Sequence, residues 1–84
     1  MFDTNKITYR VFREEKPVTS FRASSDEVFA ALIRQLYTEF GIVPVFPNWD
    51  CELRSRGSSY LSDGGACIRI TVIPGGFRLS IPLE

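Results

Sequence analysis

Two pairs of adjacent carboxylates are the first residues in this sequence whose spacing could support chemistry. Glu14-Glu15 and Asp26-Glu27 each place two acids side by side, and general acid–base catalysis commonly uses such pairs. The first pair falls in the polar segment "REEKP", and the second stands where a helix is expected to begin. A solvated turn and a helix cap account for both pairs, so we assign neither a catalytic role.

The chain lacks the residues on which most enzymes and metal sites depend. It contains no histidine, which removes the usual general base, the usual zinc ligand and every Ser–His or Cys–His pair. It also contains no G-x-G-x-x-G motif, no P-loop and no C-x-x-C motif. The sequence therefore predicts a protein that is not an enzyme, with no catalytic residues, no cofactor and no metal site.

Length and composition predict one small folded domain, residues 1–84. The chain is 44% hydrophobic, and its 10 basic residues equal its 10 acidic residues, so net charge selects no partner. No apolar run approaches the roughly 20 residues that span a membrane. The first ten residues do not have the pattern of a secretion signal. We therefore expect a cytoplasmic protein that is not bound to a membrane.

A helix from about Ser25 to Phe40 carries the strongest local signals. Ser24 and Glu27 have the spacing of a capping box, in which each side chain bonds the backbone amide of the other. Apolar side chains then recur every four residues, and Gly41 is a suitable residue to end the helix. The recurring residues are Val28, Leu32, Leu36 and Phe40.

Alternating apolar residues predict strands on both sides of this helix. "ITYRVFR" and "VTSFRA" form a hairpin that sets Tyr9 opposite Phe21 and Val11 opposite Thr19. After the helix, "GIVPVFPNW" is expected to wrap over the helix end, "DCELRSR" to form a third strand, and 57–66 to form a long polar loop. "CIRITVI" and "FRLSIPL" complete the sheet. The predicted fold is α+β in the order ββαβββ, a two-layer domain with one helix packed on one face of a mainly antiparallel sheet.

Gly75-Gly76 separates the last two predicted strands and suits the tight turn of a hairpin. With these two glycines as the turn, aliphatic side chains on one face form opposed pairs. The pairs are Val72 with Leu79, Ile70 with Ile81, and Ile68 with Leu83. A shift of one residue would move every apolar side chain to the other face, so the pattern favours the hairpin.

The segment "SDGGACIRITVIPGG" also resembles the C-terminal stretch of the ubiquitin-like sulfur carriers of thiamine and molybdopterin synthesis. In that family an Asp-Gly turn precedes an alternating strand that ends in Gly-Gly. The order of hairpin, helix and strands over residues 7–76 resembles the β-grasp fold of the family. The resemblance implies a covalent carrier that reacts through Gly76. The chain continues to Glu84, so this function needs cleavage of the tail, whereas the apolar alternation after Gly76 favours a structural strand.

Most of the arginines fall on one predicted face of the sheet. If the helix covers the apolar face, strand alternation sends six of the eight arginines to the opposite side, where Glu52 is the only clear acidic neighbour. These six are Arg10, Arg22, Arg54, Arg56, Arg69 and Arg78. Two interpretations stay open. Arginine stems keep an open sheet face soluble, and guanidinium groups grip carboxylates or phosphates.

A binding role for this face requires an anionic partner. Single-stranded nucleic acid is usually bound on exposed aromatic rings, and only Phe12, with Ile73 as a further apolar contact, is predicted there. The sequence pI of about 6.2 also lacks the basic excess of nucleic-acid-binding domains. An acidic protein surface or a nucleoprotein complex is therefore the expected partner, with Tyr60 in the loop 57–66 as an adaptable contact.

The two cysteines are expected to be reduced thiols. Cys51 shares strand parity with Leu53 and is predicted to point into the core, whereas Cys67 shares parity with Arg69 and points outward. Opposite directions make a disulfide between them geometrically unfavourable.

The small size, the lack of a motif and the polarised arginine face resemble small phage-encoded inhibitors such as anti-CRISPR proteins. The resemblance is one of size and character, and it assigns no functional residue. It implies a non-catalytic inhibitor that sterically blocks a host effector complex in the cytoplasm of the host cell. An immunity protein or a toxin partner would have the same sequence character. The ubiquitin-like carrier and a nucleic-acid-binding domain stay open as alternatives.

Overall fold

The computed structural model describes residues 5–82 and has two layers, a six-stranded sheet and two helices. The elements in chain order are β1 (Ile7–Arg13), β2 (Lys16–Ala23), α1 (Val28–Phe40), β3 (Val43–Pro44), α2 (Trp49–Arg56), β4 (Ser58–Asp63), β5 (Ala66–Ile73) and β6 (Gly76–Ser80). The predicted two-layer α+β class is confirmed. The second helix and the short strand β3 were not predicted.

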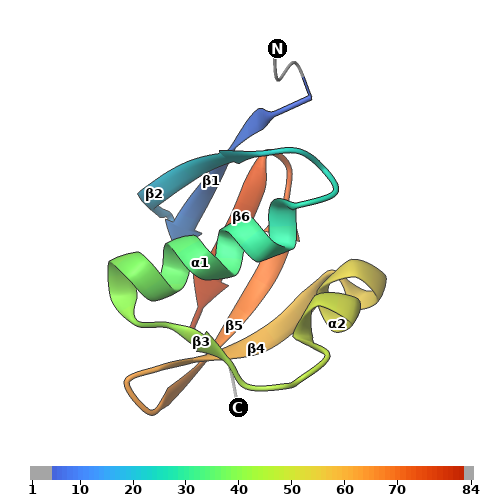
Figure 1. Cartoon of the computed structure of the whole chain (residues 1–84). Helices are drawn as coiled ribbons and strands as arrows, with labels where there is room; N and C mark the ends of the chain where they lie inside the picture. The colour runs from blue at the N-terminus through green and yellow to red at the C-terminus, as the bar shows by residue number, and fades with distance from the viewer. Residues whose placement is uncertain (1–4, 83–84) are drawn as a thin grey trace.

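The strands lie in the order β2-β1-β6-β5-β4-β3, so the last strand in the sequence lies in the middle of the sheet. Every neighbouring pair is antiparallel except β1 and β6, which are parallel. Figure 1 shows α1 lying across the sheet and α2 beside β4. Because α1 contacts both edge strands, β2 and β3, the sheet curls around this helix. We call the opposite, uncovered side of the sheet the open face.

The core lies between the helices and the covered side of the sheet. The predicted four-residue repeat places Val28, Leu32 and Leu36 inside, and α2 adds Leu53. The strand residues buried against them are Val11, Ala23, Leu61, Ile68, Ile70, Phe77 and Leu79. The aromatic rings of Tyr9, Phe21, Phe29 and Phe77 pack together beside this cluster. Burial of this apolar surface is the main force that holds the helices to the sheet.

The helix α1 differs from its prediction at one end. The predicted capping box is wrong: no side chain within residues 5–82 caps the helix, and residues 25–27 form a turn in which the Glu27 amide donates to the Ser24 carbonyl oxygen at 3.1 Å. The predicted end is confirmed, because Gly41 has a left-handed φ of 72°, its amide donates to the Tyr37 carbonyl oxygen at 2.9 Å, and the Ile42 amide donates to the Leu36 carbonyl oxygen at 3.3 Å.

The segment "DCELRSR" was predicted as a strand, and this prediction is wrong. It forms most of α2, in which Trp49 and Leu53 lie one turn apart against the core. Acidic residues occupy the first turn of α2 and arginines the last turn, and both suit the helix dipole. Gly57, with a φ of 79°, ends the helix. The alternation of Cys51 and Leu53 suggested a strand, whereas the spacing of four between Trp49 and Leu53 fits a helix, so two periods competed in one short segment.

The prediction of a long polar loop at 57–66 is also wrong. The segment contains strand β4 and a tight turn, in which Gly64 and Gly65 both have positive φ, leading into β5. Leu61 in β4 is fully buried. The many serines of this segment concealed an alternating strand, because only one of its inward side chains is a large apolar residue.

The first hairpin has the predicted register, with Tyr9 opposite Phe21 and Val11 opposite Thr19. The last hairpin turns at Pro74-Gly75 instead of Gly75-Gly76, so Val72 lies opposite Phe77. Proline followed by a glycine with a φ of 79° suits a type II turn. The difference from the predicted register is two residues, which leaves every side chain on its predicted face.

Three residues predicted for the core are exposed, two near the ends of β1 and β5 and one just after β6. Ile7, Val72 and Ile81 belong to the covered side of the sheet by alternation, yet they are 54%, 45% and 73% exposed. The helices therefore do not extend over the full length of the strands.

Gly76 has no room for a side chain. A Cβ atom at this position would lie 2.8 Å from the amide nitrogen and from the carbonyl carbon of Arg10, and closer still to its carbonyl oxygen. At Gly75 a Cβ would meet nothing within 4 Å, and only its positive φ disfavours a side chain.

We expect Gly76→Ala to lower the free energy of unfolding by about 3 kcal/mol or more, because β1 and β6 must move apart. Gly75→Ala is the matched control, and its positive φ costs about 1–2 kcal/mol. Urea unfolding followed by circular dichroism measures both values. Equal losses in the two variants would contradict the close approach of β1 and β6.

Candidate partner-binding face

Four of the six arginines predicted to share a face do lie together on the open face. Arg22 belongs to β2, Arg10 to β1, Arg78 to β6 and Arg69 to β5. Each alternates along its strand with residues that are buried on the covered side. Examples are Val11 in β1, Leu79 in β6 and Ile70 in β5. The strand order places these four strands next to one another.

The pairing register arranges the four side chains in a diagonal line. Arg10 lies opposite Ser20, and Arg22 lies two residues further along β2. The same offset of two residues separates Arg10 from Arg78 and Arg78 from Arg69 on their neighbouring strands. Diagonal neighbours of this kind are about 7–8 Å apart in a sheet. We call Arg22, Arg10, Arg78 and Arg69, in this order, the arginine row.

The other two predicted arginines are not on this face, because their segment is a helix. Arg54 lies in α2, and its guanidinium carbon is 4.7 Å from the centre of the Phe29 ring on the covered side. Arg56 pairs with Glu52 one helical turn earlier, at 3.9 Å. Glu52, predicted as the acidic neighbour of the arginine face, therefore neutralises a helix surface instead.

Within residues 5–82, no arginine of the row forms an ion pair with a carboxylate. Arg22 donates to the backbone oxygen of Lys6 at 3.3 Å, and Arg69 donates to the Tyr60 hydroxyl at 3.2 Å. The Nε atom of Arg78 is buried without a hydrogen-bond partner. A buried donor of a charged group without a partner is unfavourable, so the fold leaves this atom of the row unsatisfied.

Tyr60 lies at one end of the arginine row. It was predicted in a loop, and this placement is wrong, because Tyr60 belongs to β4 directly opposite Arg69. The guanidinium carbon of Arg69 is 5.6 Å from the centre of the Tyr60 ring, so stacking and the hydrogen bond both fix Arg69. Tyr60, predicted as a partner contact, lies beside Arg69 of the arginine row.

Sequence reasoning missed Phe46, which contacts the Tyr60 ring edge-on with 6.2 Å between ring centres. Phe46 is 41% exposed, and so is Val43 in the neighbouring strand β3. We call Tyr60, Phe46 and Val43 the aromatic end of the row. Phe46 lies in a proline-interrupted segment with no strand period, so the sequence contained no signal for its position.

Phe12 and Ile73 lie on the open face as predicted. Phe12 pairs with Arg78 across β1 and β6, and Ile73 pairs with Gly76. Beside the row, a shallow hollow of about 330 Å³ is lined by Thr8, Arg10, Phe12, Pro74 and Gly75. It borders the exposed side chain of Arg10, so a ligand bound to this arginine would have adjacent apolar contacts.

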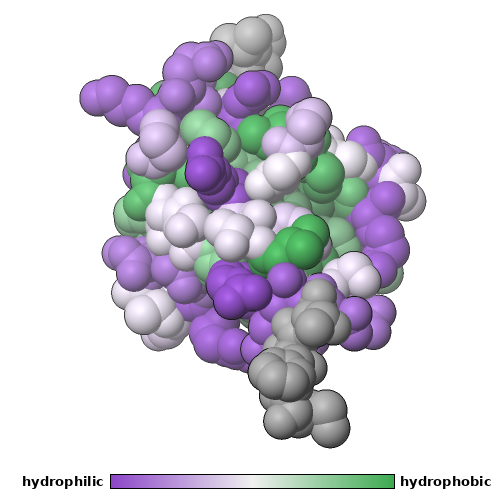
Figure 2. Space-filling model, turned by 90° about the horizontal axis from the view of Figure 1, so that it is seen from above, coloured by the Kyte–Doolittle hydropathy of each residue, from purple (hydrophilic) through white to green (hydrophobic). Residues whose placement is uncertain are grey.

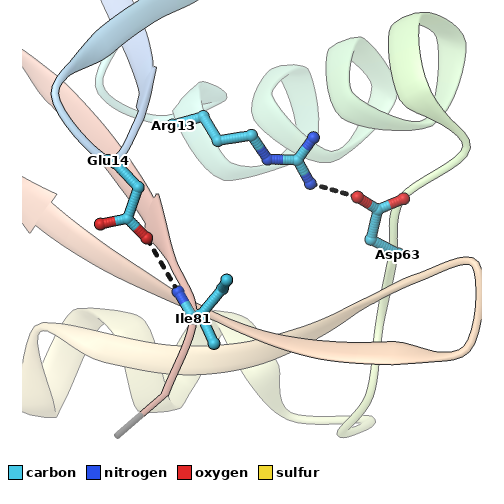
Figure 3. Close-up of polar contacts among 4 residues, drawn as sticks. All are labelled: Arg13, Glu14, Asp63 and Ile81. Atoms are coloured by element: carbon cyan, nitrogen blue, oxygen red, sulfur yellow. Dashed lines mark hydrogen bonds and ion pairs between the residues drawn. The ribbon is translucent and has the colours of Figure 1, made fainter.

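Arg13, unlike the arginines of the row, forms an ion pair with a carboxylate (Figure 3). It lies on the covered side at the end of β1, and its guanidinium group pairs with the Asp63 carboxylate at the end of β4. Nearby, the Ile81 amide donates to the Glu14 carboxylate at 3.1 Å. These contacts border an apolar hollow of about 280 Å³. The Asp63 and Glu14 carboxylates are thus engaged away from the open face.

Gly75 and Gly76 serve the last hairpin. Gly76 is the first residue of β6, which lies between β1 and β5 and contributes the buried side chains of Phe77 and Leu79. A carrier with Gly76 as its free terminus would have to lose this whole strand. Cleavage would therefore remove part of the core and leave β1 and β5 without their common neighbour.

The prediction that Cys51 is a core residue is wrong, because its segment is helical and the side chain lies on the outer surface of α2. Both Cys51 and Cys67 are free and exposed. Cys67 lies opposite Ser62 on the open face, as its parity predicted.

We expect both thiols to react with Ellman's reagent in the folded protein, releasing two equivalents of chromophore without denaturant. Cys51→Ser and Cys67→Ser should each release one equivalent. Release of only one equivalent by the wild type, retained in Cys51→Ser, would mean that Cys51 is buried.

Comparison of the chain with protein-family models, with curated proteins and with solved structures finds no match. Among residues 5–82, no group of three or more Cys, Asp or Glu is placed to hold a metal ion. In that same part of the chain, neither helix has the length and apolar character needed to cross a membrane. Figure 2 shows the molecule from above, where hydrophobic surface is interspersed with hydrophilic side chains.

Proposed function

We propose that this chain is a non-catalytic protein-binding module that holds an acidic surface of its partner on the arginine row. In the manner of small anti-CRISPR-like inhibitors, it acts by occupying a surface that a host effector or nucleoprotein complex needs. Its setting is the cytoplasm, that of the host cell if a phage encodes the chain. No step of this function requires a catalytic residue or a cofactor.

The observation that supports this proposal is the one-sided charge of the open face. The row contains four arginines with no paired carboxylate within residues 5–82, although the whole chain has a net charge of zero. Solubility alone does not require arginine, since lysine would serve as well. The planar guanidinium group is favoured where carboxylates or phosphates are bound through two parallel hydrogen bonds.

An acidic protein is a better partner than nucleic acid on two grounds. Tyr60 is already stacked by Arg69, which leaves its ring less available to a base. The chain as a whole has no positive charge in excess, so long-range attraction to a polyanion is weak. The other alternative, a ubiquitin-like carrier, faces the loss of β6 on cleavage.

The test is a pull-down from nuclease-treated bacterial lysate with two variants of equal charge. Arg10→Gln with Arg78→Gln removes two charges from the row. Arg34→Gln with Arg56→Gln removes two charges from exposed positions on α1 and α2. We expect wild type and the helix variant to capture the same protein complex in stoichiometric amount. The row variant should capture at least about tenfold less of this complex, because two charge-assisted contacts disappear.

Circular dichroism and thermal unfolding show whether both variants are folded. Equal capture by the row variant and the helix variant would overturn the role of the row. Binding restored only by added nucleic acid would instead support the nucleic-acid-binding alternative.

A further inference from the structure

The shape of the open face restricts what kind of acidic partner can contact the whole row. The sheet curls around α1, which contacts both edge strands, so the open face is its convex side. Three diagonal steps separate Arg22 from Arg69, which makes the row roughly 20–25 Å long. A flat or rigid acidic surface would touch only part of a convex row of this length.

A short extended segment satisfies this shape. An extended chain rises about 3.3 Å per residue, so roughly seven residues span the row and can follow its curvature. Every second side chain of such a segment points to the same side, at intervals of about 6.6–6.8 Å. Acidic residues at alternate positions therefore match the step between neighbouring arginines within the reach of their long side chains.

The two ends of the row differ, which gives the binding a direction. Beyond Arg22 the sheet ends at the edge strand β2. Beyond Arg69 lies the aromatic end, where Phe46 and Val43 are each 41% exposed. Exposed apolar side chains beside a charged row form a suitable contact for one apolar residue at the end of an acidic segment.

We infer that the partner presents an extended segment with acidic residues at alternate positions and one apolar residue at one end. This inference rests on the proposed function and specifies its partner. The carboxylates lie along the arginine row, where Arg10 and Arg78 hold the two central ones and Arg69, fixed by Tyr60, holds the one nearest the aromatic end. The apolar side chain packs on Phe46 at the aromatic end.

The test measures fluorescence anisotropy of labelled synthetic peptides at 150 mM salt. The anchored peptide has four glutamates alternating with serines and a phenylalanine at one end, made in both orders. The unanchored peptide has serine in place of the phenylalanine. A helical alanine-based peptide has the same four glutamates spaced four residues apart, and a single-stranded oligothymidine serves as the nucleic-acid probe.

We expect wild type to bind one of the two anchored peptides about fivefold or more tightly than the unanchored peptide, since a partly buried phenyl ring contributes to binding. Phe46→Ser should reduce this difference to less than about twofold without changing the affinity for the unanchored peptide. Arg10→Gln with Arg78→Gln should lower the affinity for both peptides about tenfold. Arg34→Gln with Arg56→Gln should change neither affinity by more than about twofold. If Phe46→Ser is not folded, Val43→Ser takes its place.

Several results would overturn the inference. Equal affinity for the anchored and unanchored peptides would contradict a contact with an apolar residue at the aromatic end. Tighter binding of the helical peptide would contradict an extended conformation of the bound segment. Absence of peptide binding, or tighter row-dependent binding of oligothymidine, would exclude an acidic segment as the ligand. Failure here while the row variant still loses its protein complex would leave the proposed function in place. Equal capture in that pull-down would remove both.

Discussion

The rest of the structure depends on the pairing of β6 between β1 and β5. This strand closes the sheet by a parallel contact with β1 at Arg10 and Gly76, where the backbones approach too closely for any side chain. It also contributes Phe77 and Leu79 to the core beneath α1. Because β6 comes last in the sequence, the N-terminal hairpin and the C-terminal hairpin join into one sheet only through this strand.

The same pairing creates the arginine row. Arg78 lies in β6, and its diagonal neighbours are Arg10 in β1 and Arg69 in β5. Without β6 in this position, the arginines of the two hairpins would belong to separate surfaces. The covered side of the sheet binds the helices through apolar contacts, and the open face carries guanidinium groups that no carboxylate within residues 5–82 pairs. Fold and candidate site therefore have one structural cause.

The largest errors of sequence reasoning arose where one pattern fitted two structures. The alternation of Cys51 and Leu53 suggested a strand, although acids before arginines and a following glycine are typical of a short helix. The serines of β4 suggested a loop, although the Gly64-Gly65 turn marked a hairpin. In each case burial against the rest of the protein, which is a tertiary property, decided the conformation. Both errors moved functional residues, since Arg54 left the open face and Tyr60 joined it as part of a strand.

The sequence by itself determined the faces of β1, β2, β5 and β6, because side chains in a strand alternate and a hairpin register that differs by two residues leaves them unchanged. It thereby placed Arg10, Arg22, Arg69 and Arg78 on the side opposite the helix. Only the tertiary structure decided the order of the strands, the line that these arginines form, and the position of Phe46 at its end. Strand order follows from packing between segments far apart in the chain, and no local pattern encodes it.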